Sequence, residues 1–391
     1  MTPGARLQAA IEVLDHIIDG TPAEKALTGW GRRSRYAGSK DRAAVRDHVF
    51  TALRCWRSHA ALGGGTTGRA RILGGLRDEG IDPATLFNAE GHAPSELTAE
   101  ELQPTQPATA DAERLDFPDW LWPEFSQSLG DETEAAATAL RSRAPVHLRV
   151  NTVLSDRGSA QAALADEGVQ TTAHPAASTA LEITEGARKL RNSQVYQTGQ
   201  VELQDAASQA VVELLPLADG QKVLDYCAGG GGKSLAMAAQ ADVTLFAHDT
   251  NFIRMKDLPV RASRAQIKVE TLQTSEIARQ APFDLVLCDV PCSGSGSWRR
   301  APEGKWSLTP ERLAGIQETQ AQILDQVAPL VAPGGVLAYA TCSMLTSENL
   351  DQVHAFLDRT PGWELTASNS WRVHHGHDGF FAAVLTRKGD G

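Results

Sequence analysis

The stretch Asp225-Tyr-Cys-Ala-Gly-Gly-Gly-Gly-Lys-Ser234 decides the fold of the C-terminal half of this chain. It begins inside a short apolar segment, Val223–Tyr226, and runs into a helical pattern over Lys233–Ala239. Four consecutive glycines between a strand and a helix let the backbone approach a ligand closely. The glycine spacing matches neither the dinucleotide fingerprint of hydride-transfer enzymes nor a P-loop. We therefore expect a nucleoside-binding turn of another kind, with a ligand-free glycine turn as the alternative.

Apolar segments alternate with helical patterns around this loop. The predicted strands are Val223–Tyr226, Leu245–His248, Ile267–Thr271, Leu285–Asp289, Val336–Ala340, Trp363–Thr366 and Phe381–Thr386. The predicted helices between them include Lys233–Ala239, Phe252–Ser263, Pro310–Val327 and Ser347–Leu357. This alternation predicts an α/β domain with a mostly parallel seven-stranded sheet covered on both faces. Asp249 closes the second strand, where an acidic side chain accepts the ribose hydroxyls of a nucleoside cofactor.

Two cysteines follow strands of this predicted sheet. Cys292 lies in Asp289-Val-Pro-Cys-Ser-Gly294, and Cys342 lies in Ala338-Tyr-Ala-Thr-Cys-Ser343. Reactive groups of open α/β sheets collect outside the carboxyl ends of the strands, so both thiols are expected beside the glycine loop. Cys288 lies within its strand and is expected in the core, whereas Cys227 is either core or lining. A single such cysteine is more often inert, but two at neighbouring strand ends indicate catalysis.

A pair of thiols suits one particular reaction, methylation of carbon 5 of cytosine. A thiolate that adds to carbon 6 makes carbon 5 nucleophilic toward a sulfonium methyl group. A second group near carbon 5 then helps to remove the proton and to release the thiol. Asp289, three residues before Cys292, is placed to hold or protonate ring nitrogen 3. The base must be unstacked, because the thiolate attacks the face of the ring.

Several ordered motifs resemble those of the Nol/Nop/Sun family of RNA cytosine-5 methyltransferases, in particular its bacterial ribosomal-RNA branch. Between about His147 and Arg387 they are Arg149-Val-Asn151, Gln204-Asp-Ala-Ala-Ser208, the Cys-Ala-x-x-Gly-Gly-Lys-Ser loop at 227–234, Asp289-Val-Pro-Cys-Ser-Gly294, Arg299-Arg300, Thr341-Cys-Ser343 and Asp378-Gly-Phe-Phe381. The resemblance implies a Rossmann-like class I methyltransferase domain with S-adenosyl-L-methionine as cofactor. The expected substrate is small-subunit ribosomal RNA.

The resemblance also implies roles for individual residues. Cys342 corresponds to the nucleophile, Cys292 to the group that assists product release, and Asp289 and Lys233 to groups near the base. The cofactor-binding residues that we expect are Cys227, Ala228, Gly229, Gly230, Gly231, Gly232, Lys233, Asp249, Arg254 and Asp289. This chain departs from the family twice: Gly229-Gly230 replaces an Ala-Pro pair, and Thr271–Ser275 lacks an acidic residue near the adenine. Gln273 and Thr274 remain as possible hydrogen-bonding partners there.

The N-terminal region is predicted to be a small all-helical domain over residues 1–85, and it resembles a NusB-like RNA-binding domain. Arg32 to Arg57 contains eight basic and two acidic residues, accompanied by Trp30, Tyr36 and Trp56. Such a mixture favours phosphate contact and base stacking, with a solvated helix face as the alternative. The predicted RNA-binding residues are Arg32, Arg33, Arg35, Arg299 and Arg300. A linker at 86–117, an extension of helices and a small sheet at 118–200, and the methyltransferase domain at 201–391 complete the predicted organisation.

Bulk composition restricts the class of protein. The net charge of −11 argues against a protein that coats nucleic acid globally, although a local basic region remains compatible with RNA binding. Five irregularly spaced cysteines predict neither a disulfide scaffold nor a zinc site. No apolar stretch approaches the length of a membrane span, so we expect a cytoplasmic protein. We also expect a monomer that binds no metal. Two competing hypotheses are a non-catalytic RNA-binding or ribosome-assembly factor and a methyltransferase acting on transfer RNA or DNA.

Overall fold

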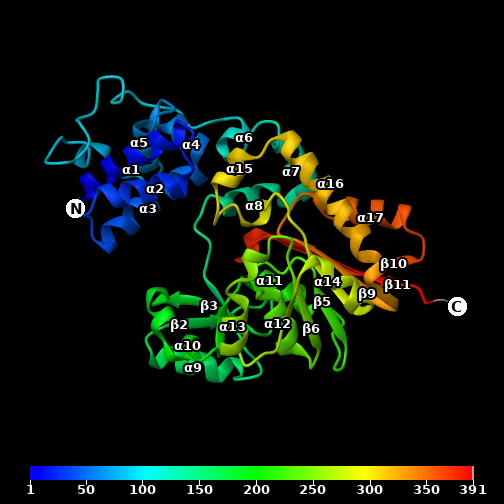
Figure 1. Cartoon of the computed structure of the whole chain (residues 1–391). Coiled ribbons are helices and arrows are strands. Elements are labelled where there is room, and N and C mark those ends of the chain that lie inside the picture. Colours follow the sequence, from blue (N-terminus) through cyan, green and yellow to red (C-terminus); the bar gives the residue numbers. More distant parts are fainter. Residues whose placement is uncertain (390–391) are drawn as a thin grey trace. The chain divides into compact units, whose positions relative to one another are not determined.

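The computed structural model describes residues 1–389 and contains two compact units (Figure 1). The helical unit comprises residues 1–143 together with residues 298–308, and the sheet unit comprises residues 144–297 and those from 309 onward. The predicted fold class, a mostly parallel seven-stranded α/β domain preceded by a helical region, is confirmed. The units do not follow the predicted boundaries, because residues 118–143 and 298–308 pack with the N-terminal helices.

The seven-stranded sheet has the strand order β10-β11-β9-β8-β5-β6-β7. Its strands are β5 (Lys222–Asp225), β6 (Thr244–His248), β7 (Glu270–Leu272), β8 (Phe283–Asp289), β9 (Val331–Thr341), β10 (Trp363–Trp371) and β11 (Phe380–Arg387). Strands β5 to β9 pair in parallel, and β11 is antiparallel to both of its neighbours. The third strand, β7, begins at Glu270 instead of the predicted Ile267 and follows a turn in which Gln266 has a positive φ of 57°.

Helices cover both faces of this sheet, as Figure 1 shows. They are α11 (Ala206–Glu213), α12 (Gly232–Gln240), α13 (Leu258–Arg264), α14 (Thr274–Gln280), α16 (Pro310–Val327) and α17 (Leu350–Arg359). Successive β8 residues alternate between two cores: Leu285 and Leu287 pack with Met237, and Val286 and Cys288 pack with Tyr339. The predicted helix at 252–263 divides into η4 (Phe252–Met255) and α13, because Pro259 favours the first turn of a new helix.

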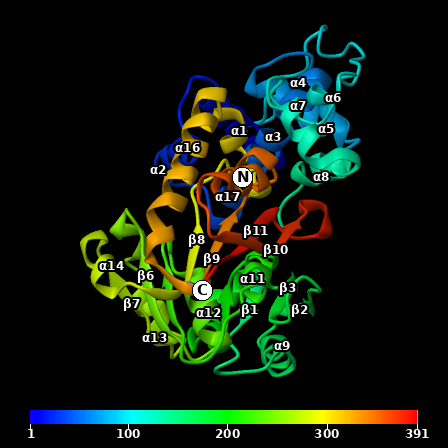
Figure 2. The same ribbon diagram turned by 90° about the vertical axis from the view of Figure 1, so that its right-hand side faces the viewer.

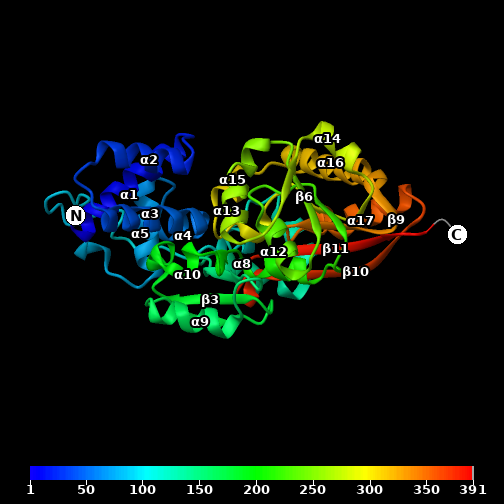
Figure 3. The same ribbon diagram turned by 60° about the horizontal axis from the view of Figure 1, so that its bottom comes forward.

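A small antiparallel sheet precedes the seven-stranded sheet, with the order β2-β3-β1-β4. Its strands are β1 (His147–Val150), β2 (Gln170–Ala173), β3 (Ala180–Glu185) and β4 (Val201–Leu203). Helix α9 (Arg157–Asp166) lies along this sheet, as Figure 3 shows, and α10 (Gln194–Gln197) packs with it. Ala160 and Leu164 of α9 are fully buried against Leu148 and Leu181, so this sheet has its own apolar core.

The helical unit is formed by α1 (Pro3–Ile18), α2 (Ala23–Arg33), α3 (Ser39–Arg54), α4 (Trp56–Gly63), α5 (Gly68–Asp78), α6 (Asp111–Arg114), α7 (Trp122–Leu129), α8 (Thr133–Leu140) and α15 (Glu303–Ser307). Helices α4 to α8 cluster together in Figure 2. Residues 86–117 contain little helix, yet they do not form the predicted linker. Phe87 and Phe117 are buried, and the buried carboxylate of Asp116 accepts hydrogen bonds from Arg57 and Ser58.

None of the helices within residues 1–389 combines the length and the apolar character that a membrane crossing requires.

Candidate active site

The two predicted catalytic cysteines lie together at the carboxyl ends of β8 and β9. These strands pair in parallel, with Asp289 opposite Ala340, so the loops that follow them leave the same edge of the sheet. The Sγ atoms of Cys292 and Cys342 are 3.3 Å apart, and both side chains are half-buried. Cys288, by contrast, is fully buried in the core, which agrees with its predicted role. The juxtaposition that the two motifs predicted is therefore present.

The two sulfurs share a hydrogen bond in which either thiol can be the donor. The bond with Cys342, together with burial, raises the pKa of Cys292 well above its ordinary value. Cys292 therefore keeps its proton at neutral pH and is available as a hydrogen-bond donor beside Cys342, although sulfur hydrogen bonds are weak.

Lys233 and Asp289 form a buried ion pair beside the cysteines. The Nζ atom of Lys233 donates to Oδ2 of Asp289 at 2.6 Å and lies 4.9 Å from the centre of the Phe380 ring. Burial alone lowers the pKa of this lysine, but its charge interaction and hydrogen bond with Asp289 outweigh burial, so the net pKa is raised. The charge of Cys342 acts in the same direction, which places the ammonium group within the field of that sulfur. Asp289 consequently has a proton donor at hand.

A buried glutamate that the sequence reasoning missed joins the two cysteine loops. The carboxylate of Glu348 accepts hydrogen bonds from the backbone N–H of Ser293 at 2.7 Å and from the hydroxyls of Ser293 and Ser343, each at 2.5 Å. Gln320 of α16 adds a fourth donor at 3.1 Å. Ser293 and Ser343 directly follow the two cysteines, so Glu348 fixes both loops to one charged group. The next residue, Asn349, accepts from Thr341 and donates to the carbonyl of Ser343.

The glycine loop turns from β5 into α12 as predicted. Gly229 and Gly231 have positive φ angles of 53° and 77°, which favour glycine. A Cβ atom at Gly231 would lie 2.3 Å from Cδ1 of Leu258, so only glycine lets the loop pack here. The guanidinium of Arg261 donates to the carbonyl of Gly230. The four-glycine segment is thus held by specific contacts.

Asp249 lies behind this loop with its carboxylate almost fully buried. It accepts hydrogen bonds from the N–H groups of Gly229 at 3.0 Å and Asn251 at 2.9 Å, and from Arg254 at 3.0 Å. The side chain of Arg254 is 61% exposed, so the ion pair is screened by water and readily replaced. Gln273 and Thr274 are the possible replacements for the acidic residue that this chain lacks after β7. The hydroxyl of Thr274 is hydrogen-bonded to Nε2 of His248 at 2.9 Å, and the backbone N–H of Gln273 donates to Glu276.

Asp225, at the end of β5, has a strongly perturbed carboxyl group. It accepts from the hydroxyl of Ser234 at 2.6 Å, while its Oδ1 atom is buried and without a partner among the described residues. Burial raises the pKa of Asp225 from 3.8 to about 7. A carboxyl group in this environment is protonated over most of the acidic range.

We expect Asp225 to make stability depend on pH. Between its unfolded pKa of 3.8 and its folded pKa of about 7, the folded chain binds more protons than the unfolded chain. The contribution of this group to the free energy of unfolding therefore falls as pH rises through this window, by at most about 4 kcal/mol. In urea unfolding, Asp225→Asn should gain stability relative to the wild type between pH 5 and pH 8. A difference that is the same at both pH values would contradict the assignment.

The predicted RNA-binding residues differ in their accessibility. Arg32, Arg33 and Arg35, around the end of α2, are exposed, as is Arg300. Arg299 is 3% exposed and its carbonyl accepts from Arg54, so its side chain is not displayed and we withdraw it from the proposed RNA contacts. Trp30 is also buried in the core of the helical unit, which makes it unavailable for base stacking.

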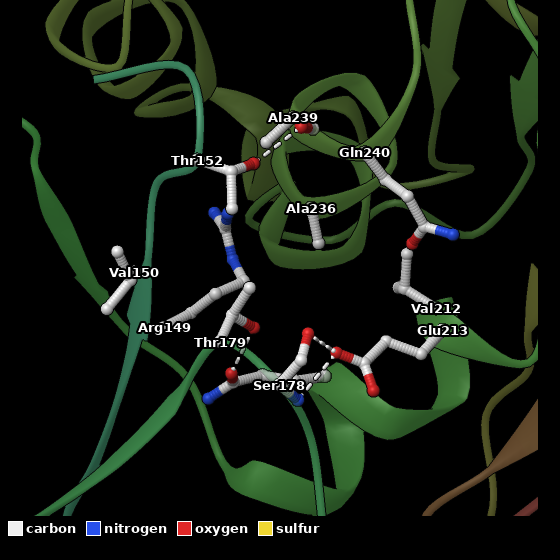
Figure 4. Close-up of a pocket in the computed structure, with 11 residues that line it drawn as sticks. Arg149, Val150, Thr152, Ser178, Thr179, Val212, Glu213, Ala236, Ala239 and Gln240 are labelled. Carbon is white, nitrogen blue, oxygen red and sulfur yellow. Dashed lines mark hydrogen bonds between the residues drawn. The ribbon is translucent and has the colours of Figure 1, made fainter. Parts of the chain in front are cut away.

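A cavity of about 430 Å³ lies between the small sheet and helices α11 and α12 (Figure 4). Its polar walls are largely paired with each other: Ser178 donates to Glu213, Thr179 donates to Gln209, and Thr152 donates to the carbonyl of Ala239. Of the residues that line it, none belongs to the predicted cysteine or cofactor sites. Arg149 of the Arg-Val-Asn motif lies here, where burial lowers its pKa to about 10 and Gln204 accepts its Nε–H. This cavity is distinct from the candidate active site.

Comparison with known proteins identifies the family. The family model described as 16S rRNA methyltransferase RsmB/F matches residues 212–386, and the model of the RsmF/B-like ferredoxin-like domain matches residues 117–188. Ribosomal RNA small subunit methyltransferase B of Vibrio cholerae is 32% identical over 344 residues, which are 85% of this chain and 77% of that protein. The chain belongs to the RsmB/F methyltransferase family. The predicted bacterial ribosomal-RNA branch of methyltransferases is thereby confirmed.

Another relative agrees with this membership, and solved structures agree with the fold. The probable ribosomal RNA small subunit methyltransferase B of Bacillus subtilis is 31% identical, covering 71% of this chain and 68% of that protein. The crystal structure of PH0851 covers 98% of this chain and 99% of its own, with a TM-score of 0.75 and 23% identity. NSun6 from Pyrococcus horikoshii, solved with SFG, has a TM-score of 0.62 and 16% identity, covering 70% of this chain and 99% of its own. The last two support the fold alone.

Proposed function

We propose that this RsmB/F family member methylates carbon 5 of a cytosine in 16S ribosomal RNA, with S-adenosylmethionine as the methyl donor. The observation that supports this most strongly is the 3.3 Å separation of the Cys292 and Cys342 sulfurs next to the Lys233–Asp289 ion pair. One thiol is needed to activate the ring and a second group to complete the reaction. The names of the curated relatives, ribosomal RNA small subunit methyltransferase B, support the choice of RNA.

The glycine loop and Asp249 fit a nucleoside-containing methyl donor. Gly229 to Gly232 carry no side chains, so their backbone can approach the donor's amino-acid part closely. A carboxylate offers roughly four acceptor positions, and that of Asp249 uses three, one of them on the exposed Arg254. Ribose hydroxyls can therefore bind Asp249 when Arg254 moves away. When bound there, S-adenosylmethionine supplies an electrophilic methyl group.

The first step falls to Cys342. Its thiolate, with Cys292 as hydrogen-bond donor, adds to carbon 6 of the cytosine and forms a carbon–sulfur bond. Electron density moves through the ring toward nitrogen 3, where a proton shared between Lys233 and Asp289 can be delivered. Carbon 5 becomes nucleophilic and takes the methyl group.

The second step restores the ring. Carbon 5 gives its proton to the sulfur of Cys292, whose own thiol proton passes to the sulfur of Cys342 as the bond between that sulfur and carbon 6 breaks, and nitrogen 3 returns its proton to the Lys233–Asp289 pair. Cys292 lies close enough to the leaving sulfur to relay protons during this elimination. Without it, the adduct between protein and RNA should persist.

The RNA must present an unstacked cytosine, because the thiolate attacks the face of the ring. Arg32, Arg33, Arg35 and Arg300 are the phosphate contacts that we propose, since all four are exposed. Together they would provide a salt-dependent, sequence-independent part of the affinity.

The proposed activity is tested with the purified chain, radiolabelled S-adenosylmethionine and 16S ribosomal RNA from a strain that lacks the corresponding gene. Label should appear in RNA, and bisulfite sequencing should locate it on a cytosine. The altered Gly229-Gly230 loop motivates the competing hypothesis of a non-catalytic RNA-binding factor. Absence of detectable cofactor binding at millimolar concentration would favour that hypothesis.

Replacing Asp249 with Asn should weaken cofactor binding selectively. The substitution removes the charge that accepts the ribose hydroxyls, and a charge-assisted hydrogen bond is worth about 1.5–3 kcal/mol. The dissociation constant of S-adenosylmethionine should therefore rise roughly 10- to 100-fold by isothermal titration calorimetry. Glu270→Gln, on the exposed side of β7, is the matched control. Equal affinities of the two variants would exclude Asp249 from the cofactor site.

A further inference from the structure

A second cavity, of about 500 Å³, lies entirely within the helical unit. The end of α1, the α3–α4 junction, α5 and α15 surround it. Its walls include Leu53, Trp56, Arg71, Glu303 and Trp306. This volume is within the range of small-molecule sites and accommodates one nucleotide.

Arg71 is a buried cation that forms no ion pair among the described residues of this cavity. It is 5% exposed, its Nε–H donates to the carbonyl of Trp56 at 3.1 Å, and its Nη1 atom has no hydrogen-bond partner. Within residues 1–389 its guanidinium forms no ion pair at contact distance, and the charge of Asp15 acts on it only from further away. Burial lowers the pKa of Arg71 to about 10, so the group is still charged at neutral pH. A buried charge is costly unless it is paired, which indicates a missing anion.

Two tryptophans give the cavity flat apolar walls. The guanidinium carbon of Arg71 lies 3.6 Å from the centre of the Trp56 ring. Trp306 is held by its indole N–H, which donates to the carbonyl of Leu53 at 2.7 Å. Glu303 accepts from the N–H of Ala23 at the start of α2, which partly balances its charge and fixes one carboxylate oxygen. The other oxygen is a suitable acceptor for an amino group of a base.

We propose that this cavity binds one nucleotide of the RNA substrate, with a phosphate on Arg71 and the base against Trp56 and Trp306. Arginine recognises phosphate through a planar set of donors, and base–tryptophan stacking contributes about 1–3 kcal/mol per base. The assignment rests on the proposed function for the identity of the ligand, because a free mononucleotide has the same chemistry. The cavity would select unpaired nucleotides, in addition to the phosphate contacts proposed for the exposed arginines.

The test uses the full chain and a fluorescein-labelled, single-stranded 12-nucleotide RNA in anisotropy titrations at several salt concentrations. Arg71→Met should raise the dissociation constant about tenfold and reduce the salt slope by about 1. Lys25→Met is the matched control, since this exposed α2 lysine is not part of the cavity wall, and it should change affinity by less than twofold. Trp306→Leu should weaken binding without changing the salt slope.

Three outcomes would overturn the proposal. One is an unchanged dissociation constant for folded Arg71→Met and Trp306→Leu, with folding checked by thermal unfolding. Another is an equal loss of RNA affinity in Arg71→Met and Lys25→Met. The third is Arg71-dependent binding of cytidine monophosphate with unchanged RNA affinity, which would indicate a free nucleotide. If Arg71-dependent RNA binding is observed but the wild type transfers no methyl group, the proposed function fails and the cavity assignment stands.

Discussion

Replacement of Cys342 by Ala is expected to abolish methylation, whereas replacement of Cys292 by Ala is expected to trap a covalent protein–RNA complex. The difference follows from the roles that we propose for the two sulfurs, which are 3.3 Å apart, and from the raised pKa of the Cys292 thiol. Without the Cys342 sulfur, carbon 5 is not activated, and a loss of at least about 10³-fold is expected for removal of a nucleophile. Without the Cys292 sulfur, the bond to carbon 6 forms but is not resolved.

The measurement combines a radiolabel assay with a denaturing gel. The Cys292→Ala variant should give a slowly migrating band that disappears after digestion with ribonuclease and is absent from the double variant Cys292→Ala/Cys342→Ala. Cys288→Ala is the matched control, because this cysteine is buried within β8 and its loss should reduce stability modestly but leave turnover intact. Full turnover by Cys342→Ala, or a band that depends on Cys342 replacement instead, would refute the roles.

Replacement of Glu348 by Ala is expected to have the second-largest effect. Four donors converge on this buried carboxylate, and its removal leaves the N–H of Ser293 without its acceptor, whereas Gln320 keeps its bond to the carbonyl of Pro291. A buried donor without a partner costs about 1–3 kcal/mol, so the free energy of unfolding should fall by about 3 kcal/mol. Methylation should fall at least tenfold, because the Cys292 and Cys342 loops are no longer fixed to each other.

Two measurements separate positioning from general destabilisation. Glu348 acts through Ser293 and Ser343, so its loss should lower kcat even at temperatures well below the midpoint of thermal unfolding. The dissociation constant of S-adenosylmethionine should stay unchanged. Glu348→Gln, which keeps one acceptor oxygen, should recover part of kcat. The control Glu364→Gln, on the exposed face of β10, should match the wild type. Unaltered kcat in folded Glu348→Ala would show that catalysis does not require Glu348 to hold the two cysteine loops together.

The sequence alone predicted the sheet and the pairing of the cysteines for a physical reason. Buried parallel strands appear as short apolar segments, and the residues that follow them must meet at one edge. Val223–Tyr226 and Leu285–Asp289 therefore predicted where Asp225, Asp289 and Cys292 would lie. The glycine loop was equally informative, since its conformation restricts the residue type.

Contacts between segments far apart in sequence were not predictable in this way. Glu348 lies in the polar segment Thr346-Ser-Glu-Asn349, which has no periodicity, and its role depends on Ser293, 55 residues earlier in the chain. The serine after each cysteine was the available signal, because a buried hydroxyl requires a partner. Likewise, the polar composition of 86–117 suggested a linker, although the buried Asp116 makes that composition structural. The prediction that Arg299 contacts RNA was wrong because sequence does not report burial.

The chain crosses between its two units three times, after residues 143, 297 and 308. A fragment beginning at Ala144 would consequently retain Trp298, Lys305 and Trp306 while losing the residues that bury them, such as Phe117 and Leu53. Truncation before Ala144 should therefore yield a product that aggregates and is poorly soluble.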